Sequence, residues 1–124
     1  MTSTGTFAFR YGAIRPLLSV LGMGPRVSSI ELEDGVLRVR MGWAFRTEIP
    51  VQHITGVQPR QGLPGGIGVH GWRGRWLVNG AATGLVAISV DPAVRSWATG
   101  VPVKLHELTL SLEDPDAFIA ALGR

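Results

Sequence analysis

The chain has 124 residues, no cysteine, and a formal net charge of +3 from twelve basic and nine acidic residues. This length fits one domain with a core of its own, and the lack of cysteine excludes disulfides, thiol catalysis and thiolate metal sites. The longest apolar stretch, Pro16 to Pro25, is too short to cross a membrane, and no signal-peptide pattern precedes it. We therefore expect a cytoplasmic protein without a membrane span, with peripheral attachment to a membrane as an open alternative.

The first 26 residues are predicted to form a strand and a short helix that pack on the rest of the domain. Apolar and polar residues alternate from Thr6 to Tyr11, as in a strand. A helix is predicted over Ala13 to Leu21, because apolar residues recur there at helical spacing. We expect that helix to pack on its own domain rather than on a membrane, since its apolar face is short.

A hairpin is the clearest element of the first half of the chain. The Asp-Gly dipeptide at 34–35 favours a two-residue turn. Folding the chain about this turn sets Ile30 opposite Val39 and Glu31 opposite Arg38. We therefore predict that Ile30 and Val39 are buried, while Glu31 and Arg38 face each other on the solvent side.

The same alternation continues beyond the hairpin to residue 49. It places Met41, Trp43, Phe45 and Ile49 on the buried face. This run is long for one strand, so we expect a bend or turn at Gly42. The residues expected on the outer face are Arg38, Arg40, Arg46 and Glu48.

The second half of the chain contains short strands separated by glycine-rich segments. Residues 101–105 and 108–112 alternate with opposite phases, so a β-bulge or a turn is expected at His106-Glu107. Strands are also predicted over 53–58, 76–78 and 85–90, a glycine-rich loop over 60–68, and a helical turn over 91–98.

The last segment combines a strand with a capped helix. Leu108, Leu110 and Leu112 share one strand face. Asp114 is suited to the N-cap, and a helix this short is stable only when it packs on a sheet or barrel. Its other signals are Pro115 at the first helical position, Phe118 and Leu122 on one face, and Gly123 as a left-handed C-cap.

Six to eight short strands and one terminal helix predict a mainly β domain built as a sandwich or barrel. The segment SLEDPDAFIAAL at 111–122 and the strand order over 27–124 resemble bacterial pleckstrin-homology-like (PH-like) domains. The resemblance implies a bent, partly open barrel of about seven antiparallel strands over 27–124, closed by the helix, with 1–26 packed on it. It also implies recognition of peptides by strand addition at an open sheet edge. The turn at 33–35 is acidic, whereas phosphoinositide-binding members carry basic residues there.

The most unusual segment is GGIGVHGWRGRWLVN at 65–79. Glycine lets a backbone approach a ligand closely, Arg suits phosphate or carboxylate, and indole rings stack. The alternative is a structural turn with Trp in the core and Arg in solvent. If one straight strand runs through Gly74, Arg73 and Arg75 share a face opposite Trp72 and Trp76. The candidate ligand- or partner-binding residues are His70, Trp72, Arg73, Arg75, Trp76 and Asn79.

Sequence motifs for nucleotide binding, metal binding and catalysis are either absent or not supported by the residues around them. The letters G-x-G-x-x-G at 66–71 match a dinucleotide fingerprint, but a strand is predicted after them instead of a helix. His53, His70 and His106 lack the spacing of a metal site, and no nucleophile elbow or paired-carboxylate motif is present. We expect no catalytic residue, no metal and no cofactor.

These observations predict a non-catalytic binding or scaffolding domain. Its expected partner is a protein or peptide, or a second copy of the chain. The alternative is recognition of a small anionic ligand or a lipid headgroup by segment 65–79. Nucleic-acid binding is disfavoured because the positive charge is small and the C-terminal segment is acidic.

Overall fold

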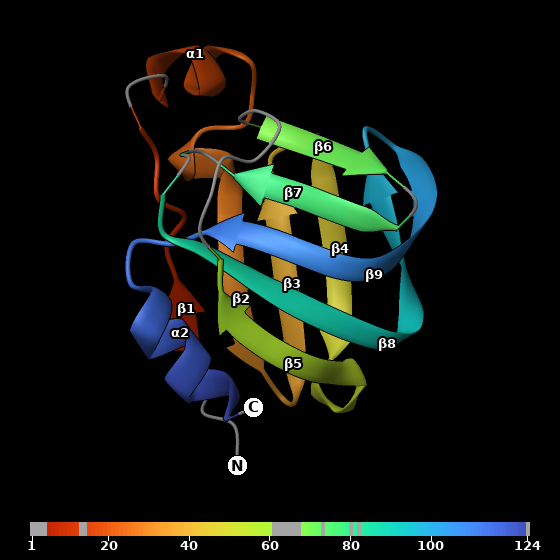
Figure 1. Ribbon diagram of the computed structural model, residues 1–124. Helices are drawn as coiled ribbons and strands as arrows, with labels where there is room; N and C mark the ends of the chain where they lie inside the picture. The colour runs from red at the N-terminus through yellow and green to blue at the C-terminus, as the bar shows by residue number, and fades with distance from the viewer. Residues whose placement is uncertain are drawn as a thin grey trace.

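The computed structural model describes residues 5–12, 15–60, 68–72, 74–79, 81 and 83–123, without the side chains of residues 15 and 68–72. This part of the chain is mainly β, a sheet curled into a half-barrel with a helix near the C-terminus (Figure 1). The elements are β1 (Gly5–Phe7), α1 (Arg15–Val20), η1 (Pro25–Val27), β2 (Ser28–Glu33), β3 (Val36–Met41), β4 (Phe45–Pro50), η2 (Val51–His53), β5 (Ile54–Pro59), β6 (Gly68–Trp72), β7 (Arg75–Asn79), β8 (Leu85–Ala98), β9 (Val101–Ser111) and α2 (Pro115–Leu122).

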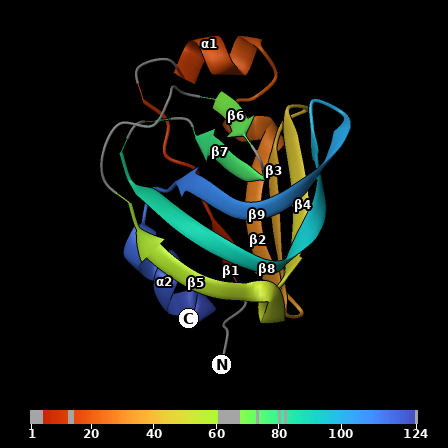
Figure 2. The same ribbon diagram turned by 45° about the vertical axis from the view of Figure 1, so that its right-hand side comes forward.

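The half-barrel has two sides that share the long strands β8 and β9. The strand order is β1-β2-β3-β4-β8-β9-β7-β6, and β5 pairs with β8 outside this path. The first half of β8 pairs with β5, where Val86 lies opposite Pro59, and its last residues pair with β4, where Ala98 lies opposite Phe45. Strands β8 and β9 therefore curve from one side of the half-barrel to the other (Figures 1 and 2).

A bulge lies where β8 and β9 curve. Their register shifts between Ser89 and Val94, so that 90–93 on β8 lie across from His106 alone on β9. The bulge predicted at this point of the chain is confirmed. The helical turn predicted over 91–98 is wrong: Asp91-Pro92 looks like a helix start, but the following residues alternate toward the core and belong to β8.

The predicted hairpin forms with the predicted register. Ile30 pairs with Val39, both buried, and Glu31 pairs with Arg38 on the other face. Arg38 makes its ion pair with Glu48 of β4, at 3.2 Å, rather than with Glu31. The expected turn at Gly42 is present, but Trp43 is 61% exposed, so its predicted burial is wrong. A turn interrupts the period of two, and Trp43 lies in that turn.

Two expectations about the sheet are wrong. The described sheet has nine strands instead of about seven, and β7 pairs with β9 in parallel, with Trp76 opposite Leu108. Strands β7 and β8 are consecutive in the chain but do not pair with each other, because β9 lies between them. Strand β9 runs antiparallel to β8 and parallel to β7. Hairpin reasoning applies only to consecutive strands and cannot reach this pairing.

The N-terminal segment joins the same sheet as the rest of the domain. Strand β1 pairs with β2, and the Arg10 N–H then donates to the Ser111 carbonyl at 2.9 Å at the end of β9. The strand predicted over 6–11 is thus present in part, as β1 and a bridge between Phe9 and Leu112. Helix α1 falls within the predicted 13–21, of which residues 13 and 14 lie outside the described residues.

Helix α2 has the predicted caps and the predicted buried face. The Asp114 carboxylate accepts a hydrogen bond from the Ala117 N–H at 3.1 Å, and Gly123 is left-handed at φ 65°. Phe118 and Leu122 are fully buried, and the Phe118 ring meets Phe7 edge-on at 5.1 Å. The helix therefore ties β1 to the core between the two sides of the half-barrel.

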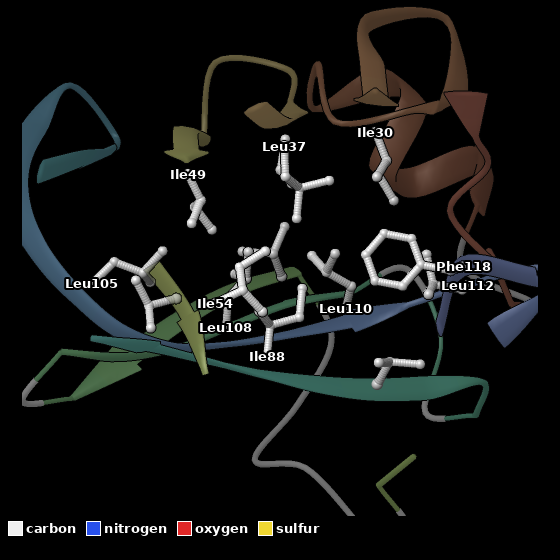
Figure 3. Close-up of a cluster of buried hydrophobic side chains, with 14 of the residues drawn as sticks. Ile30, Leu37, Ile49, Ile54, Ile88, Leu105, Leu108, Leu110, Leu112 and Phe118 are labelled. Carbon is white, nitrogen blue, oxygen red and sulfur yellow. The ribbon is translucent and has the colours of Figure 1, made fainter. Parts of the chain in front are cut away.

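The core fills the space between the two sides of the half-barrel. Figure 3 shows side chains from β2, β3 and β4 meeting others from β5, β8 and β9, with Phe118 of α2 beside them. The labelled residues are Ile30, Leu37, Ile49, Ile54, Ile88, Leu105, Leu108, Leu110, Leu112 and Phe118.

A buried polar pair lies where β4 meets β8. The Thr47 and Ser96 hydroxyls lie 2.7 Å apart, and both residues are buried. We expect Thr47→Val to lower the free energy of unfolding by about 1–3 kcal/mol, because the Ser96 hydroxyl loses its buried partner. The double variant Thr47→Val/Ser96→Ala should regain part of this loss. Urea unfolding midpoints measure both, and a double variant less stable than the single one would contradict the explanation.

Candidate functional site

The segment predicted to carry the site forms a hairpin of β6 and β7. Trp72 pairs with Arg75 and Gly71 with Trp76, so the chain reverses between Trp72 and Arg75. The condition of one straight strand through Gly74, on which the predicted faces of Arg73, Arg75, Trp72 and Trp76 depended, is therefore not met. Gly74 has a φ of 83°, a conformation that glycine adopts at little cost and that suits a tight turn.

The candidate residues of β7 have different surroundings. Trp76 is half-buried against the core, with its ring 6.2 Å from that of Phe45. Asn79 is fully buried, and its amide donates to the Ala81 carbonyl at 2.8 Å. Both side chains contribute to the fold, and only Arg75 of this strand presents an exposed charge.

The charge of Arg75 is partly compensated. Its Nε lies 3.6 Å from a Glu107 carboxylate oxygen. The other oxygen of Glu107 pairs with Arg60, which also donates to the Thr109 hydroxyl at 3.1 Å. An anionic ligand at Arg75 would have to compete with this carboxylate.

The remaining candidates are placed only in part. His70 and Trp72 belong to β6 by their backbone, and the orientation of their side chains is outside the description. Arg73 lies outside the described residues. Their role in binding stays a prediction.

Sequence reasoning expected Arg40 and Arg46 on the outer face, but it missed that β8 and β9 extend this face with two further cations. Arg40 pairs directly with Arg46, Arg46 lies opposite Trp97, and Arg95 lies opposite Lys104. The Arg46 guanidinium stands 4.8 Å from the centre of the Trp97 ring. We call Arg40, Arg46, Arg95 and Lys104 the basic face; within the described part of the chain, none of them lies within ion-pair distance of a carboxylate.

Exposed apolar side chains gather beside the basic face. Among the described residues, six large apolar side chains are exposed: Leu17, Val20, Leu21, Val27, Trp43 and Val101. They come from α1 and the residue after it, from η1, from the β3–β4 turn, and from the start of β9 beside the β8–β9 turn. Those turns are adjacent, because the Thr99 N–H donates to the Ala44 carbonyl at 2.8 Å. We call these six residues the apolar end.

The apolar end is held together by hydrogen bonds. The Trp43 indole N–H donates to the Leu21 carbonyl at 2.6 Å, and the Gly42 N–H donates to the Val27 carbonyl at 3.0 Å. A spacing of three and four residues along α1, read from the sequence, puts Leu17, Val20 and Leu21 on one helix face. The series for which the sequence predicts packing on the domain is Ile14, Leu17, Leu18 and Leu21. Of these, Leu18 is buried, Leu17 and Leu21 are exposed, and residue 14 lies outside the described residues.

Two titratable side chains outside these surfaces, His53 and Tyr11, contact backbone carbonyl groups and so contribute to the fold. The His53 ring Nδ1 lies 3.0 Å from the Pro92 carbonyl oxygen. Burial raises the pKa of Tyr11, a hydrogen bond with Ser28 offsets part of that shift, and its hydroxyl donates to the Met23 carbonyl at 2.8 Å. Across the described ranges, no group of three His, Asp or Glu side chains is placed to hold a metal ion.

Comparisons with protein-family models, with curated proteins and with solved structures find no match. Over the residues that the structure describes, no helix is long and apolar enough to span a membrane.

Proposed function

We propose that the protein is a non-catalytic binding domain that takes up an extended peptide segment along strand β6. The observation that carries this proposal is the position of β6: it pairs with β7 on one side and ends the order of the described sheet. An edge strand offers unpaired N–H and C=O groups that a further strand can use. The peptide can belong to another protein or to a second copy of this chain.

The composition of β6 supports this use. Gly68 and Gly71 lie in the strand, so a peptide backbone meets no side chain at two of its five positions. A half-barrel closed by a C-terminal helix also supports the PH-like assignment, with which strand addition agrees. The parallel pairing of β7 with β9 departs from the meander of those domains.

The alternative is binding of a small anionic ligand or a lipid headgroup by segment 65–79. The exposed Arg75 supports it, and the nearby Glu107 carboxylate weighs against it. Peptide binding needs only the backbone of β6, so we place it first.

The backbone pattern of the hairpin identifies the residue to change. A two-residue turn closes on a pair that exchanges backbone hydrogen bonds, here Trp72 and Arg75. Hydrogen-bonded and non-hydrogen-bonded pairs alternate along an antiparallel ladder, so His70 bonds to β7 in the same way as Trp72. The N–H groups of Val69 and Gly71, which lie between these positions, therefore point to the open edge.

We expect Val69→Pro to abolish binding of peptides selected from a displayed peptide library against the parent protein. Proline removes an N–H that the incoming strand needs, and it is tolerated at the outer side of an edge strand. Affinity is measured by calorimetry, and methylation of alternate backbone nitrogens of the peptide should cause the same loss. His70→Pro is the control that breaks the bond to β7 and lowers stability instead. Peptides that bind Val69→Pro as tightly as the parent would contradict the assignment to β6.

A further inference from the structure

We infer that the apolar end and the basic face together form a surface that docks on an anionic lipid bilayer. In this arrangement the six apolar side chains enter the interfacial layer, and the four cations lie against lipid phosphates. The surface uses no residue of β6, so the inference does not depend on the peptide-binding proposal, although β6 and α1 lie at the same end of the half-barrel in Figures 1 and 2.

The first argument is where the exposed apolar side chains lie. All six large ones that are exposed in the described part of the chain occur at one end of the half-barrel, the end that carries α1 in Figures 1 and 2. Val20 is 84% exposed and Trp43 is 61% exposed. Water-exposed apolar side chains from four separate segments favour a partner with an apolar interior.

The second argument is the state of the Trp43 indole. Tryptophan is enriched at membrane interfaces, where its apolar ring is buried and its N–H remains bonded. Here the N–H is already satisfied by the Leu21 carbonyl at 2.6 Å. The ring can therefore leave water without exposing an unpaired donor to lipid, which would be costly.

The third argument is the charge next to the apolar end. Arg40 and Arg46 flank the β3–β4 turn that carries Trp43, and they are direct cross-strand neighbours. Like charges in this position repel, and an anion in contact with both relieves the repulsion. Cations beside an apolar surface match a bilayer whose headgroups are acidic.

The fourth argument is the gradient of charge along the outer face of the sheet. The next rung of the outer face holds the ion pair of Arg38 and Glu48 on β3 and β4, with Arg95 and Lys104 beside it on β8 and β9. The far end carries Glu33 as the last residue of β2 and Asp34 in the turn that follows, and α2 lies toward that end. A bilayer with negative charge would therefore attract one end of the molecule and repel the other.

The test is sedimentation of the full chain with vesicles of phosphatidylcholine, with and without phosphatidylserine. Binding is expected only with phosphatidylserine, and it should weaken as salt is raised. The double variant Arg40→Gln/Arg46→Gln should bind roughly twenty-five-fold more weakly, since each cation near an acidic surface contributes roughly five-fold. The double variant Arg38→Gln/Glu48→Gln is the matched control on the same two strands and should bind within about two-fold of the parent, because it removes an exposed ion pair and leaves the net charge unchanged.

The apolar contribution is tested by Val20→Asp, which should weaken vesicle binding roughly ten-fold or more. The side chain is almost fully exposed, so the unfolding midpoint should stay that of the parent. Ala120→Asp on the exposed side of α2 is the matched control and should bind as the parent does.

Three outcomes would overturn the inference. The first is no binding to phosphatidylserine vesicles at low salt. The second is binding that neither Val20→Asp nor the double arginine variant weakens. The third is concentration-dependent self-association that Val20→Asp abolishes in sedimentation without vesicles, which would assign the apolar end to a second copy of the chain.

Discussion

Replacing Phe118 with alanine is expected to lower the free energy of unfolding by about 3–5 kcal/mol, a large share of a small domain's total. Its ring is fully buried, and the edge-on contact with Phe7 would be lost with it. The cavity would open between the two sides of the half-barrel, where the surrounding strands are paired and have little freedom to close it. Chemical unfolding followed by circular dichroism measures the effect.

The matched control for Phe118→Ala is Asp116→Ala, an exposed change on the same helix that should cost less than about 1 kcal/mol. Equal unfolding midpoints for Phe118→Ala and the parent would contradict the role given to α2. They would mean that the helix can detach without affecting the cooperative core.

The second large effect is expected for Gly42→Ala. Gly42 has a φ of 53°, where an alanine costs about 1–2 kcal/mol. A methyl group there would also run into the carbonyl group of Gly22, and such overpacking costs about 1–3 kcal/mol more. The variant should lose about 2–5 kcal/mol of stability and displace the segment that carries the apolar end.

Gly100→Ala is the matched control for Gly42→Ala. Gly100 also has a positive φ, 82°, but nothing lies within 4 Å of the position that a methyl group would take. The Gly100→Ala variant should therefore lose only the stability that an alanine at positive φ costs, about 1–2 kcal/mol. Unfolding midpoints give the difference, and exchange of the Trp43 indole proton reports the detachment from Leu21. Equal losses in the two variants would show that the contact with Gly22 is unimportant.

Local pattern was sufficient to predict the elements whose neighbours in space are also neighbours in sequence. The register of the hairpin at 28–41 follows from its Asp-Gly turn together with one alternating apolar face. The same holds for α2, where the cap at Asp114 and the buried face of Phe118 are local signals. In both, residues within a few positions of one another determine the geometry.

Predictions failed where a turn or a distant strand changed the local period. Trp43 continues an alternating series, but the β3–β4 turn takes it out of the sheet and exposes it. The segment at 91–98 starts like a helix, yet β9 and the start of β4 pair with it and make it a strand. Asn79 was a binding candidate because of its sequence neighbours, and the fold buries it.

The sequence by itself determined a mainly β domain, the first hairpin with its register, a break in the strand pattern near His106 and the capped C-terminal helix. The tertiary structure alone decided that β9 lies beside β7 in parallel, and that residues as distant as Leu17, Trp43 and Val101 share one exposed end. The physical reason is the range of the interactions. Turn geometry, capping and alternation act within a few residues, whereas strand pairing and surface clustering depend on contacts between segments far apart in the chain.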